Sequence, residues 1–335
     1  MASQQVRPAF EAMDPLPKDL VTVGIIHYDD YDFLEACFRG LSQQSRISFK
    51  TLLVDNTLPE RRRSIVPPPG LNVKILVNAV NNGYAGAANQ VIGESKTPFV
   101  FLMNPDVNLE PGCLEVLLRL ALSNPSYGIW GPKLLREPGI LDSAGHDFVR
   151  SRRFRDRGMG ERDENQYPTG DIFAICGAAI LLRREMLEDI RIRDEYFDED
   201  FFVYHEDTDL CWRAWHRGWK VRYVPDAVGF HLRGWRQDNR HKVPSRVRIQ
   251  GFKNHYLELI KNETLGSFVK DLPYICTQEI LRLLHAVSRE PALWMAYWKV
   301  LLVFPKTWRK RREIMGRRDS EQFQKMLGER ARRKA

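Results

Sequence analysis

The chain has 335 residues, of which 43% are hydrophobic, so it can bury one large core with an appendage, or two domains, and disorder is excluded for most of its length. The formal net charge of +8 is concentrated at one end, because residues 241–335 carry 21 Lys and Arg against 9 Asp and Glu, whereas residues 1–240 carry 30 against 34. The five cysteines are scattered without a C-x-x-C pair, which indicates neither a disulfide framework nor a zinc site and predicts a reduced, cytoplasmic setting.

The first predicted segment is a flexible leader over residues 1–19, which is polar and lacks the apolar run of a secretory signal. From Leu20 onward, short apolar runs alternate with helical stretches, the pattern of βαβ units around a mainly parallel sheet. The predicted strands are Val21–His27, Thr51–Val54, Lys74–Val77, Phe99–Met103, Phe173–Leu182 and Lys220–Val224, and the predicted helices include Tyr31–Ser42, Ala85–Glu94 and one begun by Arg183–Glu188.

Small polar residues follow four of these strands. Because ligands bind at the carboxyl ends of strands in open parallel sheets, these positions predict a binding crevice. They are His27-Tyr28, Asp55-Asn56, Asn81 to Asn89, and Asn104-Pro105-Asp106. No G-x-G-x-x-G follows the first strand, and G-x-x-x-x-G-K-[ST], G-x-S-x-G and H-E-x-x-H do not occur. A dinucleotide oxidoreductase, a P-loop NTPase, an α/β-hydrolase and a zincin therefore lose their main support.

Three of the motifs suit a nucleoside diphosphate and a cation. Asp55 can accept hydrogen bonds from a base or ribose, with a turn-capping Asp-Asn pair as the alternative. The small residues from Asn81 to Asn89 let the backbone approach a ligand and then enter a helix whose N-terminus favours a diphosphate, although an ordinary helix start would look the same. Asp106 could supply an oxygen ligand to a hard divalent cation, against the alternative of a simple Asn-Pro-Asp turn.

Two further motifs suit catalysis. Glu206, Asp207 and Asp209 lie at the start of a predicted helix, where capping is the alternative role. One cap does not need three acids, and if they line a cleft, repulsion and burial would raise the pKa of at least one and help to make a general base. His231 follows a predicted strand, and a single histidine in that position is more often structural.

Taken together and in order, these motifs resemble glycosyltransferase family 2, especially its rhamnosyltransferase-like bacterial branch. The resemblance covers about residues 20 to 235. It is carried by Val54-Asp55-Asn56, Asn81-x-Gly83-Tyr84-Ala85-Gly86-x-x-Asn89, Leu102-Met103-Asn104-Pro105-Asp106, Asp142-Ser143-Ala144-Gly145, Cys176-Gly177-Ala178-Ala179, Tyr204-His205-Glu206-Asp207-Thr208-Asp209-Leu210, Tyr223-Val224-Pro225-Asp226 and His231.

The resemblance implies an α/β nucleotide-sugar glycosyltransferase fold of the A type (GT-A) in residues 20–240. The sequence pattern predicts a helical, basic extension in residues 241–335. It implies an inverting transfer in which Asp106 and His231 bind Mg²⁺ or Mn²⁺ and Asp207 is the catalytic base, with the adjacent Glu206 as the alternative base. The nucleotide-sugar contacts implied by the matched positions are His27, Asp55, Asn81, Gly83, Tyr84, Asn89 and Asn104. Two positions depart from the family pattern: many relatives carry Asp where Asn104 stands, and Asn-Tyr is usual where this chain has His27-Tyr28.

The sequence pattern of the C-terminal region predicts helices and no strands. The apolar run 292–304 would reach only ~20 Å as a helix, too short for a hydrocarbon core of about 30 Å. Tryptophans beside a basic cluster suit an anionic membrane surface, with a helical subdomain packed on the catalytic core as the alternative. The tryptophans are Trp294, Trp298 and Trp308, and the cluster is Lys306, Arg309, Lys310, Arg311, Arg312, Arg317 and Arg318.

These features predict an enzyme bound peripherally to the cytoplasmic face of the cell membrane. The resemblance implies a dTDP- or UDP-linked donor, with L-rhamnose from dTDP-rhamnose the first choice, and a carbohydrate or lipid-linked glycan acceptor. A nucleic-acid partner is not expected, because the positive charge is remote from the predicted cleft. The alternative from another class is a non-catalytic protein that binds nucleotide sugars or carbohydrate on the same fold.

Overall fold

The computed structural model describes residues 14–232, 243–319, 321, 323 and 325, so most of the predicted leader lies outside the described residues. A ten-stranded mixed sheet runs through the molecule in the order β3-β2-β1-β4-β9-β6-β10-β5, with β7 paired to β6 and β8 to β10. The strands are β1 Val21–His27, β2 Phe49–Asp55, β3 Val73–Val77, β4 Phe99–Met103, β5 Val107–Leu109, β6 Tyr127–Glu137, β7 Ile140–Ser143, β8 Gly170–Asp171, β9 Ala179–Arg183 and β10 Lys220–His231.

The first half of the sheet is parallel. β1 lies between β2 and β4 and is parallel to both, and β2 is parallel to β3, so the carboxyl ends of these strands share one edge. His27 at the end of β1 is in register with Asp55 at the end of β2. In the second half, β6 and β10 are parallel to each other, whereas β9 is antiparallel to both β4 and β6. The GT-A-type fold predicted from the sequence is confirmed, with a sheet that is mixed and mostly parallel.

Helices cover both faces of this sheet. The alternating side chains of β1 explain this: Val21, Val23 and Ile25 pack with α1 and α3, whereas Ile26 packs with α2, α4 and α5 on the opposite face. Gly24 lies on the α2 face, where a Cβ would overlap the side chain of Val91 in that helix. The helices of this layer are α1 Tyr31–Ser42, α2 Gly83–Glu94, α3 Cys113–Ser123, α4 Arg184–Ile190 and α5 Glu206–His216, with short 3₁₀ turns η2 Pro59–Arg61 and η3 Glu199–Phe201.

Three predicted elements are wrong in extent, and one of them is the strand predicted to end at Val224, which continues as β10 to His231. The predicted strand Phe173–Leu182 is a strand only from Ala179, and the predicted helix begun by Arg183 starts at Arg184. Residues 172–178 are mostly apolar and almost all buried, as the residues of a core strand would be. Their hydrogen bonds go elsewhere: Ala174 exchanges two backbone bonds with His146. Tertiary contacts therefore override the local β preference there.

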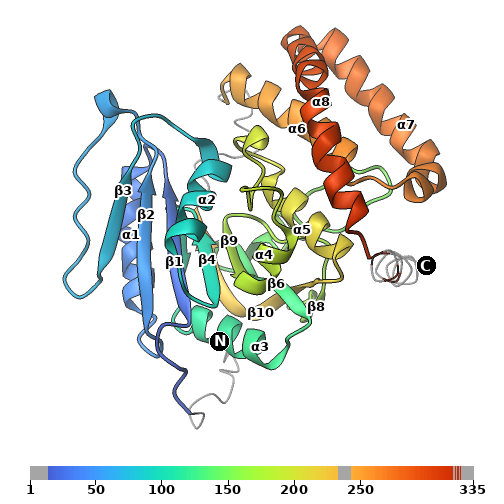
Figure 1. Ribbon diagram of the computed structural model, residues 1–335. Helices are drawn as coiled ribbons and strands as arrows, with labels where there is room; N and C mark the ends of the chain where they lie inside the picture. The colour runs from blue at the N-terminus through green and yellow to red at the C-terminus, as the bar shows by residue number, and fades with distance from the viewer. Residues whose placement is uncertain (1–13, 233–242, 320, 322, 324, 326–335) are drawn as a thin grey trace.

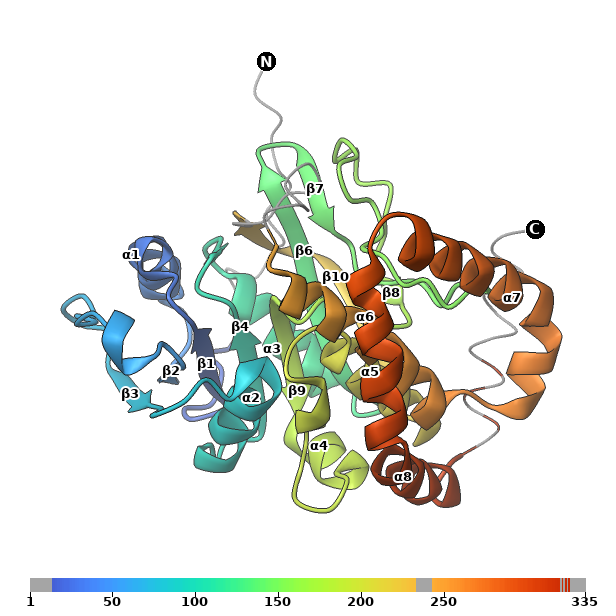
Figure 2. The same ribbon diagram turned by 90° about the horizontal axis from the view of Figure 1, so that it is seen from above.

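A second group of helices follows β10. Figures 1 and 2 show α6, α7 and α8 gathered beside α5, with α7 farthest from the sheet. No strand follows β10 among the described residues, as the sequence predicts, and no helix in the same residues is long and apolar enough to cross a membrane. The bounds are α6 Ser245–Asn262, α7 Leu265–Ser288, η5 Pro291–Leu293 and α8 Trp294–Gly316.

Part of the C-terminal basic cluster binds the core. Lys310 contacts Asp198 at 2.6 Å and Asp200 at 3.0 Å, both near η3, and Lys306 contacts Asp200 at 2.7 Å. Arg311 donates to backbone carbonyls at the end of α6. These helices are thus packed on the catalytic core, and several of the charges counted as a basic tail are already paired.

Candidate active site

The ends of β1 and β2 place a buried histidine against a carboxylate. Nδ1 of His27 lies 3.0 Å from Oδ1 of Asp55, and the backbone N–H of Thr57 donates to the same oxygen at 2.9 Å. Burial lowers the pKa of His27 although Asp55 opposes this shift. Burial opposes ionisation of Asp55, but the hydrogen bonds from Thr57 and His27 lower its pKa overall. Nε2 of His27 is buried without a partner, so it is the polar atom of this pair left for a ligand.

Asparagine side chains shape the turn into α2. The amide of Asn56 donates to the carbonyl of Gly83 at 3.0 Å and its oxygen accepts from Asn78 at 2.8 Å. Oδ1 of Asn81 accepts from the backbone N–H of Gly83 at 2.8 Å. Gly83 has φ +70°, and a Cβ there would overlap the carbonyl of Phe202, so only glycine fits. The turn therefore sits against the segment that leads to the acidic helix.

Tyr84 and Asn89 on α2 both bond to later segments. The hydroxyl of Tyr84 donates to the carbonyl of Gly177 at 2.6 Å, and burial followed by the negative charge of Glu206 raises its pKa well above the usual value. The side chain of Asn89 donates to the carbonyl of Phe197 at 2.9 Å and accepts from the N–H of the same residue at 2.8 Å. Asn89 thus holds a loop in this structure, and a direct contact with a ligand stays a prediction.

Asp106, which follows β4, lies close to His231, the last residue of β10. Oδ2 of Asp106 lies 3.5 Å from Nε2 of His231, and its Oδ1 is buried without a partner. On the other side of the ring, Nδ1 of His231 lies 2.8 Å from Oδ2 of the fully buried Asp142. Burial opposes protonation of His231, but the two carboxylates outweigh it and raise its pKa to about 9. Among the described residues no group of three or more His, Cys, Asp or Glu could hold a metal ion, so any cation here would rely on this pair and on ligand oxygens.

The acidic helix brings two carboxylates with different surroundings. Oδ2 of Asp207 accepts from the backbone N–H of Gly177 at 2.8 Å, and its Oδ1 accepts from the N–H of Thr208 at 2.7 Å. Glu206 is 5% exposed and its Oε2 has no partner. Burial, followed by repulsion from Asp207, raises the pKa of Glu206 well above its usual value. The two adjacent acids therefore differ in burial and in hydrogen bonding.

The segment 176–178 joins these two centres. The backbone N–H of Asn104, two residues before Asp106, donates to the carbonyl of Ala178 at 3.0 Å. The preceding Gly177 contacts both Tyr84 and Asp207 through its backbone. The backbone of residues 177 and 178 thus connects Tyr84 of α2, Asp207 of α5 and Asn104 after β4.

Sequence reasoning missed two acidic residues at this edge. Asp30 lies near Asp106: although the residue is largely exposed, desolvation of its carboxyl group and then the charge of Asp106 raise its pKa to about 6. Its place directly after β1, in Tyr28-Asp29-Asp30, could have marked it. Asp142 orients His231, and its membership of the Asp142-Ser143-Ala144-Gly145 motif was the available indication.

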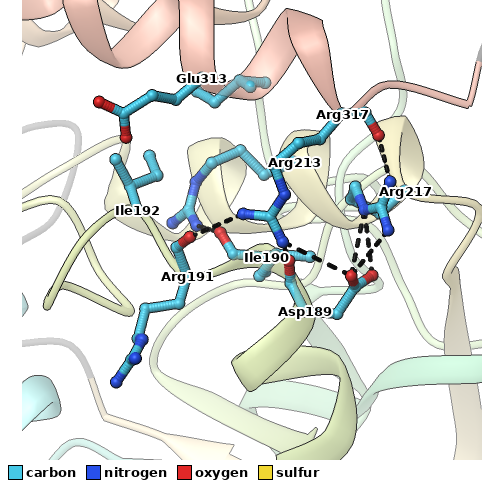
Figure 3. A pocket seen from close by; sticks show the side chains of 9 residues that line it. Asp189, Ile190, Arg191, Ile192, Arg213, Arg217, Glu313 and Arg317 are labelled. Atoms are coloured by element: carbon cyan, nitrogen blue, oxygen red, sulfur yellow. Dashed lines mark hydrogen bonds and ion pairs between the residues drawn. The ribbon is translucent and has the colours of Figure 1, made fainter.

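A cavity lined by arginines lies away from these residues. Figure 3 shows that Asp189 and Arg217 meet across it through hydrogen bonds, beneath Glu313 and Arg317 of α8 and the turn that follows it. Its volume is about 20 Å³, which is room for about one water molecule. The cavity lies between the core and the end of α8, and it is too small for a nucleotide.

Comparisons with known proteins identify relatives of this chain. The chain is 28% identical over 241 residues to N-acetylglucosaminyl-diphospho-decaprenol L-rhamnosyltransferase of Mycobacterium tuberculosis, a match that covers 64% of this chain and 76% of the relative. It is 27% identical over 170 residues to the pre-mycofactocin glycosyltransferase of the same organism, which covers 49% of this chain and 34% of that relative.

Solved structures share the fold. GalNAc-T7 with UDP, GalNAc and Mn²⁺ matches with a TM-score of 0.54 and 13% identity, over 72% of this chain and 47% of that one. The mannosyltransferase PcManGT from Pyrobaculum calidifontis with GDP-Man and Mn²⁺ matches with a TM-score of 0.50 and 14% identity, over 90% and 86%. The family model described as Glycosyl transferase family 2 matches residues 22–191, just over half of the chain. The chain therefore belongs to glycosyl transferase family 2 and is a nucleotide-sugar glycosyltransferase.

Proposed function

We propose that this protein is a metal-dependent inverting glycosyltransferase that moves a sugar from a nucleoside diphosphate to a carbohydrate or lipid-linked glycan acceptor. The observation that carries the proposal is that Asp207 and Asn104, two residues before the Asp106–His231 pair, both bond to the backbone segment 176–178. One centre suits the leaving diphosphate and the other suits the attacking hydroxyl. The nucleoside would lie toward the ends of β1 and β2, with the turn Asn81–Asn89 near the diphosphate.

The Asp106–His231 pair fits a divalent cation. Oδ1 of Asp106 is a buried carboxylate oxygen without a partner, and the imidazole of His231 is oriented by Asp142 as metal-binding histidines usually are. Carboxylate and imidazole ligands suit Mn²⁺, and Mg²⁺ commonly binds one or two carboxylates together with phosphate oxygens. When bound, the cation would neutralise the negative charge that develops on the leaving diphosphate.

Asp207 is the better placed base. Its carboxylate accepts hydrogen bonds from two backbone N–H groups, which hold it in one orientation, and the side chain is partly exposed. Glu206 is buried, and burial followed by repulsion from Asp207 raises its pKa well above the usual value, so it is the less accessible of the two acids. In the transfer, the acceptor oxygen bonds to the anomeric carbon, its proton passes to Asp207, and the diphosphate leaves with the electron pair of the broken bond. A single displacement of this kind inverts the anomeric carbon.

The donor and acceptor are inferred from the relatives. The tuberculosis rhamnosyltransferase acts, by its name, on N-acetylglucosaminyl-diphospho-decaprenol, so dTDP-rhamnose and a lipid-linked diphosphate sugar are the substrates we propose here. A UDP-linked donor is the second choice. A lipid-linked acceptor would be held at a membrane, which agrees with a peripheral location of the enzyme at the cytoplasmic face of that membrane.

The outer C-terminal helices offer a surface for that membrane. On α7, Ile280, Leu284 and Val287 are 56–58% exposed, and on α8 Trp298 and Leu302 are 63–64% exposed. Apolar side chains of this size seldom gather on a surface that faces only water. Arg309 and Arg312 of α8 are exposed and make no ion pair with any residue that the structure describes. We propose that this face contacts anionic lipid.

A panel of nucleoside diphosphate sugars, each with Mg²⁺ or Mn²⁺, tests the proposal. A donor that binds the native state raises the melting temperature, by mass action, so dTDP-rhamnose with Mn²⁺ should give the largest shift. Incubation of that donor with a short-chain polyprenyl diphosphate N-acetylglucosamine should then yield a disaccharide. Binding without transfer or hydrolysis would favour the alternative, a non-catalytic nucleotide-sugar-binding protein; no shift with any donor would reject both.

A further inference from the structure

The loop before the acidic helix has a backbone that needs support. Phe202, Tyr204 and His205 have φ of 63°, 70° and 70°, in the left-handed region that side chains other than glycine rarely adopt. Such residues persist only where surrounding contacts hold them, and they gather at functional sites. This loop, residues 202–205, ends directly at Glu206 and Asp207.

One asparagine of α6 holds most of this loop. The side-chain N–H₂ of Asn254 lies 2.7 Å from the carbonyl oxygen of Phe201 and 2.8 Å from those of Val203 and Tyr204. Asn254 is fully buried, and its neighbour Gln250 donates to the Phe201 carbonyl as well, at 2.6 Å. Carbonyls that would point apart in a regular strand therefore converge on one donor group.

A second contact from α6 reaches the residue next to the acids. Nδ1 of His205 lies 2.7 Å from Oε2 of Glu258, which is fully buried one turn after Asn254. The carbonyl of His205 accepts from the N–H of Asp209, the first helical bond of α5. The angle at which α5 begins, and with it the position of Asp207, therefore depends on this contact.

The other end of the loop touches the donor side. The carbonyl of Phe202 accepts from the N–H of Ala85 at 3.2 Å, and its ring lies against Gly83. The loop thus spans from the turn that we assign to the diphosphate to the helix that carries the base. A shift of the loop would move the base relative to the donor.

We propose that α6 is a positioning element of the transfer reaction, in which Asn254 and Glu258 set the conformation of the loop 202–205 and hence the orientation of Asp207. The inference rests on the proposed function, since it gives these residues a role in the same reaction. It makes the first C-terminal helix part of the catalytic unit, although the family model ends at residue 191.

The test compares Asn254→Ala with Tyr256→Phe. Tyr256 lies on the same helix, but its hydroxyl donates to Glu279 of α7 at 2.6 Å, so its loss weakens α6 packing without touching the loop. Both variants are assayed below their melting temperatures, for dTDP binding with Mn²⁺ by calorimetry and for rhamnosyl transfer. Because small misplacement of a catalytic group can cost about 10²-fold, we expect Asn254→Ala to lower kcat by at least roughly tenfold while the Kd for dTDP changes by less than about threefold.

Glu258 provides a graded version of the same test. Glu258→Gln keeps a side chain that can hydrogen-bond His205, whereas Glu258→Ala removes it, so the glutamine variant should recover part of the kcat that the alanine variant loses. Hydrogen exchange of residues 200–208 should be faster in Asn254→Ala than in Tyr256→Phe.

The outcomes separate the two proposals. A parent protein that binds neither dTDP nor UDP and transfers sugar from neither donor overturns the proposed function, and the catalytic role of α6 falls with it. An active parent whose Asn254→Ala variant keeps the parental kcat, or loses no more than Tyr256→Phe does, overturns the positioning role alone. A parallel loss of dTDP affinity and kcat would also overturn it, because the defect would then be general.

Discussion

The donor side and the base side of this site are built in different ways. On the donor side, β1, β2 and β4 end at the same edge, and the site residues simply follow the strands. On the base side, Glu206 and Asp207 follow the loop 202–205, in which three residues have left-handed backbone angles. This loop is held by α6, a helix some 50 residues later in the chain. Strand ends place ligand-binding residues locally, whereas the base depends on long-range packing. Donor binding and transfer should therefore be separable.

Removal of the metal ligand tests the donor side and carries the largest expected effect. Asp106→Ala should abolish metal-supported donor binding, a loss of more than about 10²-fold in metal affinity, because it removes the carboxylate that would hold the cation. Calorimetry with dTDP, with and without Mn²⁺, measures it. His231→Ala should show the same defect less completely.

Unchanged metal-dependent affinity in Asp106→Ala would reject the metal assignment. Parental affinity and turnover in His231→Ala would return that histidine, held by Asp142, to a structural role.

Substitution of the base sharpens the separation. Asp207→Asn keeps the size of the side chain but cannot take a proton at neutral pH. It should bind donor and metal nearly as the parent does, yet lose transfer by roughly 10²-fold or more. Glu206→Gln should keep more activity, because Glu206 is buried and its carboxyl group is less accessible to the acceptor than that of Asp207. Steady-state transfer kinetics, with donor affinity measured in parallel, check both variants.

An active Asp207→Asn beside an inactive Glu206→Gln would move the base to Glu206. Two active variants would mean that the acids are not catalytic.

Acidification should weaken the packing of α6 against α5 and against α7. His216 of α5 bonds to the carbonyl of Asn262, and His255 of α6 bonds to Glu279. Burial lowers the pKa of each to about 4, below the ordinary 6.5, so the unfolded state binds more protons between these values and stability falls as the pH drops below about 6.5. Between pH 7 and pH 5 each histidine should cost about 2 kcal/mol. The raised pKa of His231 offsets part of this loss.

Urea unfolding at the two pH values measures the change. His255→Gln should reduce the pH dependence by its own share. The raised pKa of Glu206 acts in the opposite direction, so the contrast between the parent and His255→Gln decides: an equal pH dependence of stability in the two proteins would contradict the assignment of His255 as neutral and buried.

Lipid binding carries the smallest expected effect. The exposed face of α7 and α8 should bind anionic liposomes in a salt-sensitive manner, with about 1 kcal/mol from each basic residue near the surface. Sedimentation should show weaker binding for the pair Arg309→Gln and Arg312→Gln, but not for Arg39→Gln, an exposed arginine on α1 of the donor half. Equal binding with and without anionic lipid, or no change after truncation at Pro291, would reject the lipid contact and leave α7 and α8 as a packed helical region only.

The sequence by itself determined the donor side well. The bounds of β1, β4 and α1 were predicted to the residue, and those of β2, β3 and α2 to within two. The polar residues after these strands were found because short apolar runs and the residues that end them are local properties of the sequence. The acids at the start of α5 were visible for the same reason, since they head a helix that the pattern marks.

Only the tertiary structure decided how these residues are oriented. Asp142 behind His231, the N–H of Gly177 on Asp207, and Asn254 on the loop 202–205 each join segments at least 30 residues apart. The same holds for the basic C-terminal cluster, of which Lys306 and Lys310 are paired with the core while Arg309 and Arg312 are exposed. Such pairings depend on which faces pack together, and no short window of sequence encodes that choice.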